Sequence, residues 1–144
     1  MYKKILGIIV VVLLAIFIVI LSVNLLKSPK MYVAENQEYN IDKDISFTVT
    51  KANNMFVTFE IVNNKSESIT YDSVYEIEKN IDGIWLKYEL EVEFVQADYT
   101  IEPGKKAVEN VVLGNVYNLG NGRYRLLKQI DSKMLCAEFE IATW

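Results

Sequence analysis

The sequence contains no histidine and only one cysteine, Cys136. An intrachain disulfide is therefore impossible, and a zinc site of Cys and His ligands is excluded because it needs three or four of them. A nucleophilic cysteine needs a base or a positive field nearby, whereas Glu138 and Glu140 share the strand face predicted for this thiol. We interpret Cys136 as inert.

Acidic residues are absent from residues 1–30, which hold four lysines. All 19 Asp and Glu residues lie in residues 31–144 with the other 11 basic residues, a net charge of −8. This charge repels phosphate backbones and anionic headgroups, which argues against nucleic-acid binding. We interpret the acidity as a source of solubility.

Charge is also absent from Ile5–Leu26, a run of 22 residues. As a helix this run reaches roughly 33 Å, enough to cross a hydrocarbon core of about 30 Å. The alternative is a core helix, but so small a domain cannot bury a helix that is apolar on every face. The run exceeds a signal peptide's apolar region of about 7–15 residues, and neither a small-x-small site nor a cysteine follows it. These features predict an uncleaved signal-anchor transmembrane helix.

The flanking lysines predict the orientation of this helix. Lys3 and Lys4 precede it, and Lys27 and Lys30 follow it, so the charge bias is slight. A short lysine-bearing tail usually stays in the cytoplasm, and Pro29 ends the helix. We expect residues 1–30 to form a cytoplasmic tail, the anchor and a linker. Residues 31–144 then form one extracytoplasmic domain of a single-pass cell-membrane protein.

The rest of the chain alternates apolar and polar residues, as half-buried strands do. Asp82-Gly83, Pro103-Gly104 and Gly120-Asn121-Gly122 are turn signals between such segments. The pattern predicts an all-β, immunoglobulin-like antiparallel sandwich of about seven strands. A short helical turn fits residues 114–119. The alternating segments are residues 45–50, 57–61, 75–78, 84–94, 107–113, 124–130 and 135–141.

Three sequence pieces carry a family likeness. They are Tyr75-Glu76-Ile77-Glu78-Lys79 with Asp82-Gly83-Ile84-Trp85, then Ile101-Glu102-Pro103-Gly104-Lys105, then Tyr117-Asn118-Leu119 with Gly122-Arg123-Tyr124-Arg125-Leu126-Leu127-Lys128. Together they resemble the bacterial immunoglobulin-like domain of small membrane-attached or lipoprotein surface proteins. The sequence differs in its Gly-Asn-Gly turn and in having a helix where many relatives have a lipidated cysteine. The resemblance implies an extracytoplasmic β-sandwich and no known reaction.

Six residues are interpreted as structural. Tyr124 follows a Leu-x-x-Gly-x-Tyr pattern that resembles the tyrosine corner of immunoglobulin-type sandwiches. Trp85 lies among charged residues and is either an exposed anchor for a ligand or, as we favour, a core residue covered by a loop. The structural residues are Trp85, Tyr124, Gly83, Pro103, Gly104 and Gly122.

Charged residues offer weaker candidates. Glu89, Glu91 and Glu93 share the outward face of the 84–94 segment and would gather a divalent cation or form an acid/base pair, but a solvated face is favoured. Asp42 and Asp44 lack the rest of a calcium loop. Arg123 and Arg125 would clamp a carboxylate, although pairing with surface glutamates is favoured. No catalytic residue, metal site or cofactor is predicted.

These features predict a non-catalytic, membrane-anchored Ig-like module that binds a protein or a cell-envelope component. Its predicted partners are the lipid bilayer, through residues 5–26, and that external component. The alternative is an accessory subunit of a membrane complex, in which Ser22 and Asn24 bond across a helix interface. An enzyme would require a site made only of carboxylates. The ligand's identity and the oligomeric state are not predicted.

Overall fold

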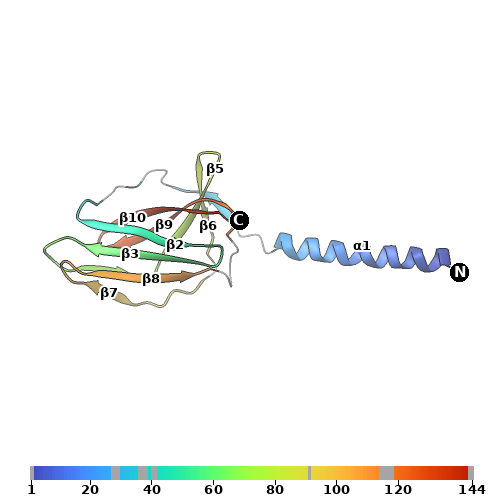
Figure 1. Cartoon of the computed structure of the whole chain (residues 1–144), viewed down its shortest axis with the longest axis horizontal. Helices are drawn as coiled ribbons and strands as arrows, with labels where there is room; N and C mark the ends of the chain where they lie inside the picture. Colours follow the sequence, from blue (N-terminus) through green and yellow to red (C-terminus); the bar gives the residue numbers. More distant parts are fainter. Residues whose placement is uncertain are drawn as a thin grey trace.

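The structure is a computed structural model that describes residues 2–26, 30–35, 39, 42–90, 92–113 and 119–142. It contains one helix followed by ten strands (Figure 1). The elements are α1 (Tyr2–Leu26), β1 (Met31–Val33), β2 (Ile45–Ala52), β3 (Phe56–Asn63), β4 (Ile69–Asp72), β5 (Glu76–Ile81), β6 (Ile84–Tyr88), β7 (Asp98–Ile101), β8 (Lys106–Val112), β9 (Gly122–Ile130) and β10 (Lys133–Ile141).

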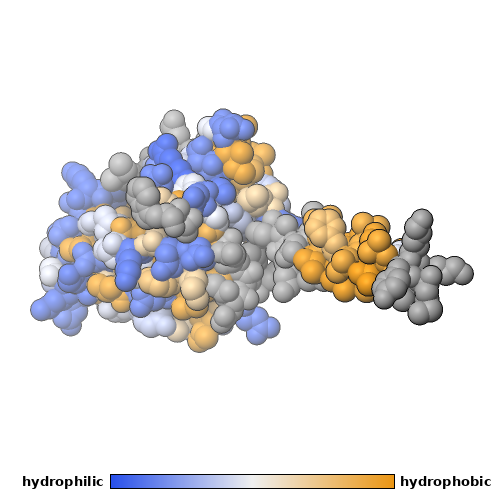
Figure 2. All heavy atoms as spheres, turned by 45° about the vertical axis from the view of Figure 1, so that its right-hand side comes forward, coloured by the Kyte–Doolittle hydropathy of each residue, from blue (hydrophilic) through white to orange (hydrophobic). Residues whose placement is uncertain are grey.

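Helix α1 projects from one end of the β-domain, with the N-terminus at its far end (Figure 1). Its large apolar side chains at residues 6, 9–14 and 16–21 are 49–66% exposed. Figure 2 shows the described atoms of this helix as an orange surface, beside a β-domain of mixed colours. The described apolar side chains of α1 are therefore left largely uncovered by the described part of the chain.

The helix predicted over residues 5–26 is confirmed as a helix. Its side chains are described at residues 6, 7 and 9–21. Within the described residues, no helix combines the length and the apolar character that a membrane crossing requires. The predicted span is thus not found.

The strands form two antiparallel sheets, as predicted. The larger sheet has the order β1-β6-β5-β9-β4-β7, with β10 also paired to β9, and the smaller sheet has the order β2-β3-β8. β10 of the larger sheet lies beside β2 of the smaller one. The prediction of about seven strands missed β1, β4 and β7. Each has three or four residues, too few to show an alternating pattern.

The main core lies between the two sheets. Alternate residues of β3 and β9 face each other there, because side chains along a strand point to opposite faces. Phe47 packs edge-on against Phe59 with ring centroids 5.5 Å apart, and Tyr124 stacks on Phe139 at 5.5 Å. Residues of β3 and β9 in this core are Val57, Phe59, Ile61, Tyr124, Leu126 and Ile130.

The predicted strand over residues 84–94 is wrong in its second half, because β6 ends at Tyr88. A strand needs a neighbour for its backbone hydrogen bonds. The Glu89 N–H still donates to the carbonyl of Lys30 at 2.9 Å, just before β1 begins. Described residues beyond Glu89 run outside any strand until β7, which pairs with β4. Glu89 and Glu93 therefore do not lie on the common strand face that was predicted for the three glutamates.

Candidate functional site

A buried ion pair lies on the outer face of the larger sheet. Glu78 of β5 and Arg125 of β9 are opposite each other in register. Arg125 Nε donates to Glu78 Oε2 at 2.5 Å, and the two side chains are only 3% and 1% exposed, respectively. Burial raises the pKa of the Glu78 carboxyl, and the guanidinium opposes this rise. The expected pairing of Arg125 with a glutamate is found, but with a buried partner instead of a surface one.

The guanidinium of Arg125 also contacts two aromatic rings. It lies 4.3 Å from the ring centre of Trp85 and 4.7 Å from that of Tyr39. Such cation–π contacts strengthen when they are shielded from water. Trp85 is buried, and its carbonyl accepts a hydrogen bond from the Ala34 N–H at 3.0 Å. Trp85 is therefore a buried residue, although it lies outside the core between the sheets.

The outer face thus holds a second, smaller buried cluster, made of Glu78, Trp85, Arg125 and Leu127. Leu127 is fully buried but does not belong to the core between the sheets. It lies opposite Cys136 of β10 in register. This cluster fixes β5, β6 and β9 together from outside the sandwich.

Two hollows open beside this cluster. The first, here called the Tyr39 hollow, has a volume of about 290 Å³. The second, here called the Phe94 hollow, has a volume of about 230 Å³. The Tyr39 hollow is lined by Tyr32, Val33, Glu35, Tyr39, Glu76, Glu78, Lys87 and Met134. The Phe94 hollow is lined by Tyr32, Val74, Tyr75, Glu76, Lys87, Tyr88, Glu89, Leu90 and Phe94.

The residues shared by the hollows are Tyr32, Glu76 and Lys87, which separate one hollow from the other. Lys87 Nζ pairs with Glu76 Oε1 at 2.7 Å. In the Phe94 hollow, Tyr75 and Phe94 meet edge to face with centroids 5.0 Å apart. This hollow is mainly aromatic and aliphatic, whereas the Tyr39 hollow contains more carboxylates.

The three glutamates considered as a cation site are not brought together. Glu89 pairs with Lys30 at 3.5 Å, and Glu93 is exposed in the segment after β6. Glu91 lies outside the described residues. Across the part of the chain that is described, no group of three acidic, His or Cys residues is placed to hold a metal ion.

Asp42 and Asp44 form a local turn. Asp42 Oδ1 accepts the N–H of Asp44 at 2.9 Å, and Lys133 Nζ donates to Asp42 Oδ2 at 2.7 Å. The hydrogen bond from Lys133, together with that from Asp44, lowers the pKa of Asp42. This carboxylate therefore ties the start of β2 to β10. Arg123, the other arginine considered, pairs with Glu138 at 2.5 Å on the surface.

Cys136 is partly buried on the outer face. Burial raises the pKa of its thiol to about 11, and the carboxylates of Glu138 and Glu78 add to this effect. The nearby charge of Arg125 acts in the opposite direction. Since the thiolate is the reactive form, this environment disfavours nucleophilic chemistry at Cys136.

Tyr124 has the geometry of a tyrosine corner. Its ring is fully buried, and its hydroxyl donates to the carbonyl of Gly120, four residues earlier, at 2.7 Å. The bond ties the segment before β9 to the core. The helical turn predicted over residues 114–119 lies, except for Leu119, outside the described residues.

The turn residues take the conformations that their types suit. Gly83 has a φ of +88° in the turn between β5 and β6, and Gly104 has a φ of +70° after Pro103. Both values lie in the left-handed region that favours glycine. Gly122 has a φ of +151°, and a Cβ there would lie 3.0 Å from Lys79 Cε.

Lys128 is a buried residue that the sequence did not reveal. It lies on the core side of β9, where its Nζ donates to the carbonyls of Asp72 and Val74. Burial lowers the pKa of its ammonium, and the charges of Glu109 and Asp72 oppose this. Its ammonium is also 5.2 Å from the ring centre of Tyr71. Position 128 lies on the same strand face as the apolar residues 124, 126 and 130. Because a lysine at that position breaks the apolar pattern, the pattern does not predict its burial.

A family profile described as a bacterial Ig-like domain matches residues 34–140. The chain belongs to this family. The matched residues include β2 to β9 in full and leave out α1 and β1. The resemblance drawn from the three sequence pieces is therefore confirmed. Bacterial Ig-like domains are typically non-enzymatic surface modules.

Solved structures share only partial likeness with the chain. They include the alkylpurine DNA glycosylase AlkC of Pseudomonas fluorescens (14% identity, TM-score 0.40, 72% of this chain and 32% of that one). A β-glucosidase of saponin metabolism from intestinal bacteria matches with 16% identity, a TM-score of 0.35, and 79% and 16% coverage. The sulfur carrier protein SoxY of Chlorobium limicola matches with 10% identity, a TM-score of 0.31, and 71% and 76% coverage.

The chain thus spans less than a third of the first two of these proteins, at 32% and 16% of their lengths. With TM-scores of 0.40 or lower, these likenesses support no functional inference. Among curated proteins, no match to the chain is found.

Proposed function

We propose that this protein is a single-pass membrane protein that presents a non-catalytic Ig-like domain outside the cytoplasm. There the domain binds a protein or a cell-envelope component. Helix α1 acts as the anchor, and residues 31–144 form the external module. The anchor fixes the module at the membrane, and the outer face of the larger sheet serves recognition.

The exposure of α1 carries this proposal. Residues 9–14 and 16–21 are large and apolar, and each is about half exposed or more. Successive helical residues are about 100° apart, so six in a row point in every direction around the axis. An amphipathic helix could bury one stripe against the sandwich, but this helix has no polar side to leave in water. A lipid environment satisfies every face at once.

The orientation rests on charge. Lys3 and Lys4 precede the apolar run, and the acidic domain follows it. Lysines near a short N-terminal tail favour its retention in the cytoplasm. The acidic module would then lie outside, where repulsion from anionic headgroups favours exposure to the solvent.

A binding role fits the chemistry of the module better than catalysis does. The chain has no histidine, and burial disfavours ionisation of its one thiol. By contrast, the outer face of the larger sheet holds the Tyr39 hollow, which the buried Glu78 of the Glu78–Arg125 pair helps to line, and the Phe94 hollow lies next to it. Sites on rigid strands hold their geometry better than sites on loops.

Protease treatment of intact cells tests the proposal. Added protease should remove an epitope at the C-terminus without lysis, and a cytoplasmic control protein should survive. Protection of the C-terminal epitope until lysis would contradict the external location.

Exchange of residues 5–26 for an unrelated membrane-spanning helix tests the alternative role as an accessory subunit. Retained partner binding supports the external module. Loss of binding with normal surface display would favour assembly through the helix, where Ser22 and Asn24 offer hydrogen bonds.

A further inference from the structure

The Phe94 hollow lies next to the tether that joins the β-domain to α1. Lys30 is hydrogen-bonded to Glu89 through the backbone and paired with it through the side chain, and Glu89 lines the hollow. Four Cα–Cα steps separate Lys30 from Leu26, the last residue of α1. A chain cannot span more than about 3.6 Å per residue, so this distance is at most about 14 Å.

If α1 lies in a bilayer, this short distance between Leu26 and Lys30 keeps the hollow close to the bilayer surface. The headgroup layer on each side of the hydrocarbon is roughly 5–8 Å thick. With Leu26 at the edge of the hydrocarbon, the strand end at Lys30 and Glu89 lies within the headgroups or just outside them. The bilayer surface is then always present beside the hollow, whereas any soluble partner has to diffuse to it.

The chemistry of the hollow suits that surface. Tyr32 and Val74 are 48% and 44% exposed, and the neighbouring Val95 is 74% exposed. Tyrosines are enriched where membranes meet water, because the ring enters the apolar layer while the hydroxyl stays hydrated. The hollow also contains a pair of packed aromatic rings, Tyr75 and Phe94. Together with the exposed apolar side chains, these rings form an apolar surface that suits contact with lipid.

The charges around the hollow are paired, so they do not add to the electrostatic repulsion between the acidic domain and anionic headgroups. Glu76 pairs with Lys87 at 2.7 Å, and Glu89 pairs with Lys30 at 3.5 Å. Each charged residue that lines the hollow is therefore paired with a group of opposite sign. In contrast to the domain as a whole, this lining does not repel headgroup phosphates.

We propose that the Phe94 hollow docks the Ig-like domain onto the outer surface of the bilayer, with Tyr32, Phe94 and Val95 inserted among the lipid headgroups. This inference rests on the proposed function, because it needs α1 in the membrane. The domain then lies against the membrane in one fixed orientation. The Tyr39 hollow and the smaller sheet remain open to the external space.

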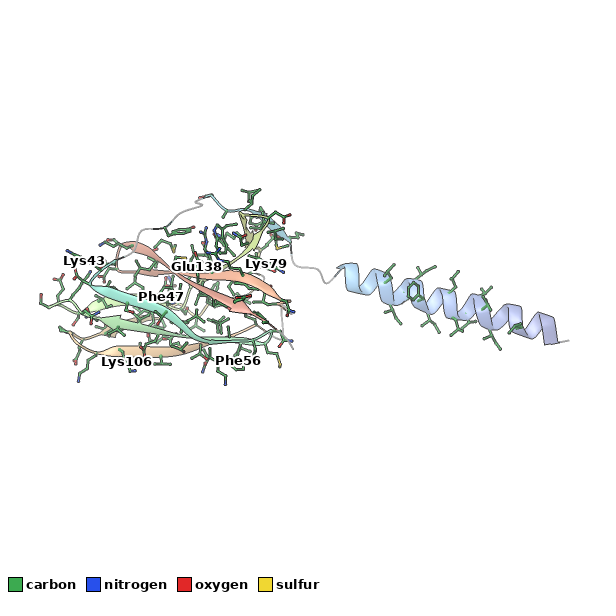
Figure 3. All side chains as sticks on the ribbon, turned by 45° about the horizontal axis from the view of Figure 1, so that its top comes forward. Lys43, Phe47, Phe56, Lys79, Lys106 and Glu138 are labelled. Atoms are coloured by element: carbon green, nitrogen blue, oxygen red, sulfur yellow. The ribbon has the colours of Figure 1, made fainter. Side chains whose placement is uncertain are left out.

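Depth-dependent fluorescence quenching tests the docking. The full-length chain with Cys136→Ser receives one new cysteine, at Val95, Lys43 or Ile16, and each variant is labelled with a small fluorophore and placed in phosphatidylcholine vesicles. Figure 3 labels Lys43 at the end of the sandwich away from α1, which makes it the control. A headgroup nitroxide lipid should remove most of the fluorescence at Val95 and little at Lys43, and a chain nitroxide lipid should quench at Ile16.

The outcomes separate the two proposals. Absence of quenching at Ile16 overturns the membrane anchor itself. Quenching at Ile16 with equal, weak quenching at Val95 and Lys43 overturns the docking alone and leaves the hollow to a protein partner.

Tyr32→Ser and Phe94→Ser should reduce the quenching at Val95, whereas Val108→Ser, an exposed valine on the other sheet, should not. Quenching at Val95 that both hollow variants leave unchanged would reflect the tether alone and would also overturn the docking.

Discussion

Glu78 and Arg125 face each other on neighbouring strands and share a 2.5 Å hydrogen bond out of contact with water. Neither charge has solvent to stabilise it, so each depends on the other. The rings of Trp85 and Tyr39 enclose the same guanidinium. The outer face of the larger sheet is therefore packed around this ion pair and not open to water there.

Replacing Arg125 with methionine should destabilise the domain by about 3–5 kcal/mol, because it leaves the Glu78 carboxylate buried without a partner. The double variant Glu78→Leu with Arg125→Met should recover most of this loss, since an apolar pair removes the stranded charge. Urea unfolding of the full-length chain in detergent, followed by tryptophan fluorescence, gives the free energies of unfolding.

Arg123→Met is the matched control for that series. Arg123 pairs with Glu138, but both side chains are largely exposed. Exposed pairs contribute about 0–1 kcal/mol, so this variant should unfold nearly as the wild type does. Equal losses for Arg123→Met and Arg125→Met would show that burial of the Glu78–Arg125 pair has no special effect.

Tyr124→Phe should lower the free energy of unfolding by about 1 kcal/mol, the usual net contribution of one hydrogen bond. The ring remains in the core, so the loss reports the hydroxyl, which donates to the carbonyl of Gly120 and is also in hydrogen-bond contact with Tyr88. Tyr99→Phe serves as the control, because the Tyr99 ring is partly exposed and stacks on Tyr71. A Tyr124→Phe variant as stable as the wild type would show that the corner bond contributes nothing.

Gly83→Ala should destabilise the domain by about 1–2 kcal/mol, since φ at this turn is +88° and an L side chain is strained there. An added Cβ at this position meets no atom within 4 Å, so the loss is conformational and not steric. Gly120→Ala also meets nothing within 4 Å, and Gly120 has no positive φ. Thermal unfolding should therefore separate the two variants, and identical melting curves would contradict this assignment.

Cys136 should react slowly with a thiol reagent in the folded protein. Burial raises the pKa of this thiol to about 11, compared with about 8.5 in an unfolded chain. At pH 8 the native thiolate population is then smaller by roughly two orders of magnitude than in urea. Labelling rates measured from pH 7 to pH 11 should keep rising toward pH 11 for the native state. A native rate that levels off near pH 9 would refute the raised pKa.

Much of the fold follows from local sequence patterns. The alternation at Ile45, Phe47 and Val49 predicts β2, and Asp82-Gly83 predicts the turn between β5 and β6. These signals are local, because strand periodicity and positive φ depend on a few neighbouring residues. The three short strands lack such signals, and their pairing depends on partners distant in the sequence.

Less of the candidate site than of the fold could be predicted from the sequence. The sequence places Glu78 and Arg125 as ordinary charged residues on alternating strands, and nothing local shows that they meet. Their burial depends on the cross-strand register and on the rings of Trp85 and Tyr39 against the guanidinium, both of which are tertiary properties. The end of β6 at Tyr88 has the same origin, since the sequence goes on alternating after Tyr88 while the described residues from Glu89 to Phe94 lie outside any strand.

The central claim is that α1 holds an otherwise water-compatible sandwich at the membrane. Alkaline carbonate extraction of membranes from cells that make the full-length protein tests it most directly. We expect the protein to stay in the membrane pellet after carbonate and to be released only by detergent, while a chain starting at Lys30 appears in the supernatant. Full-length protein in the carbonate supernatant, soluble without detergent, would contradict the account.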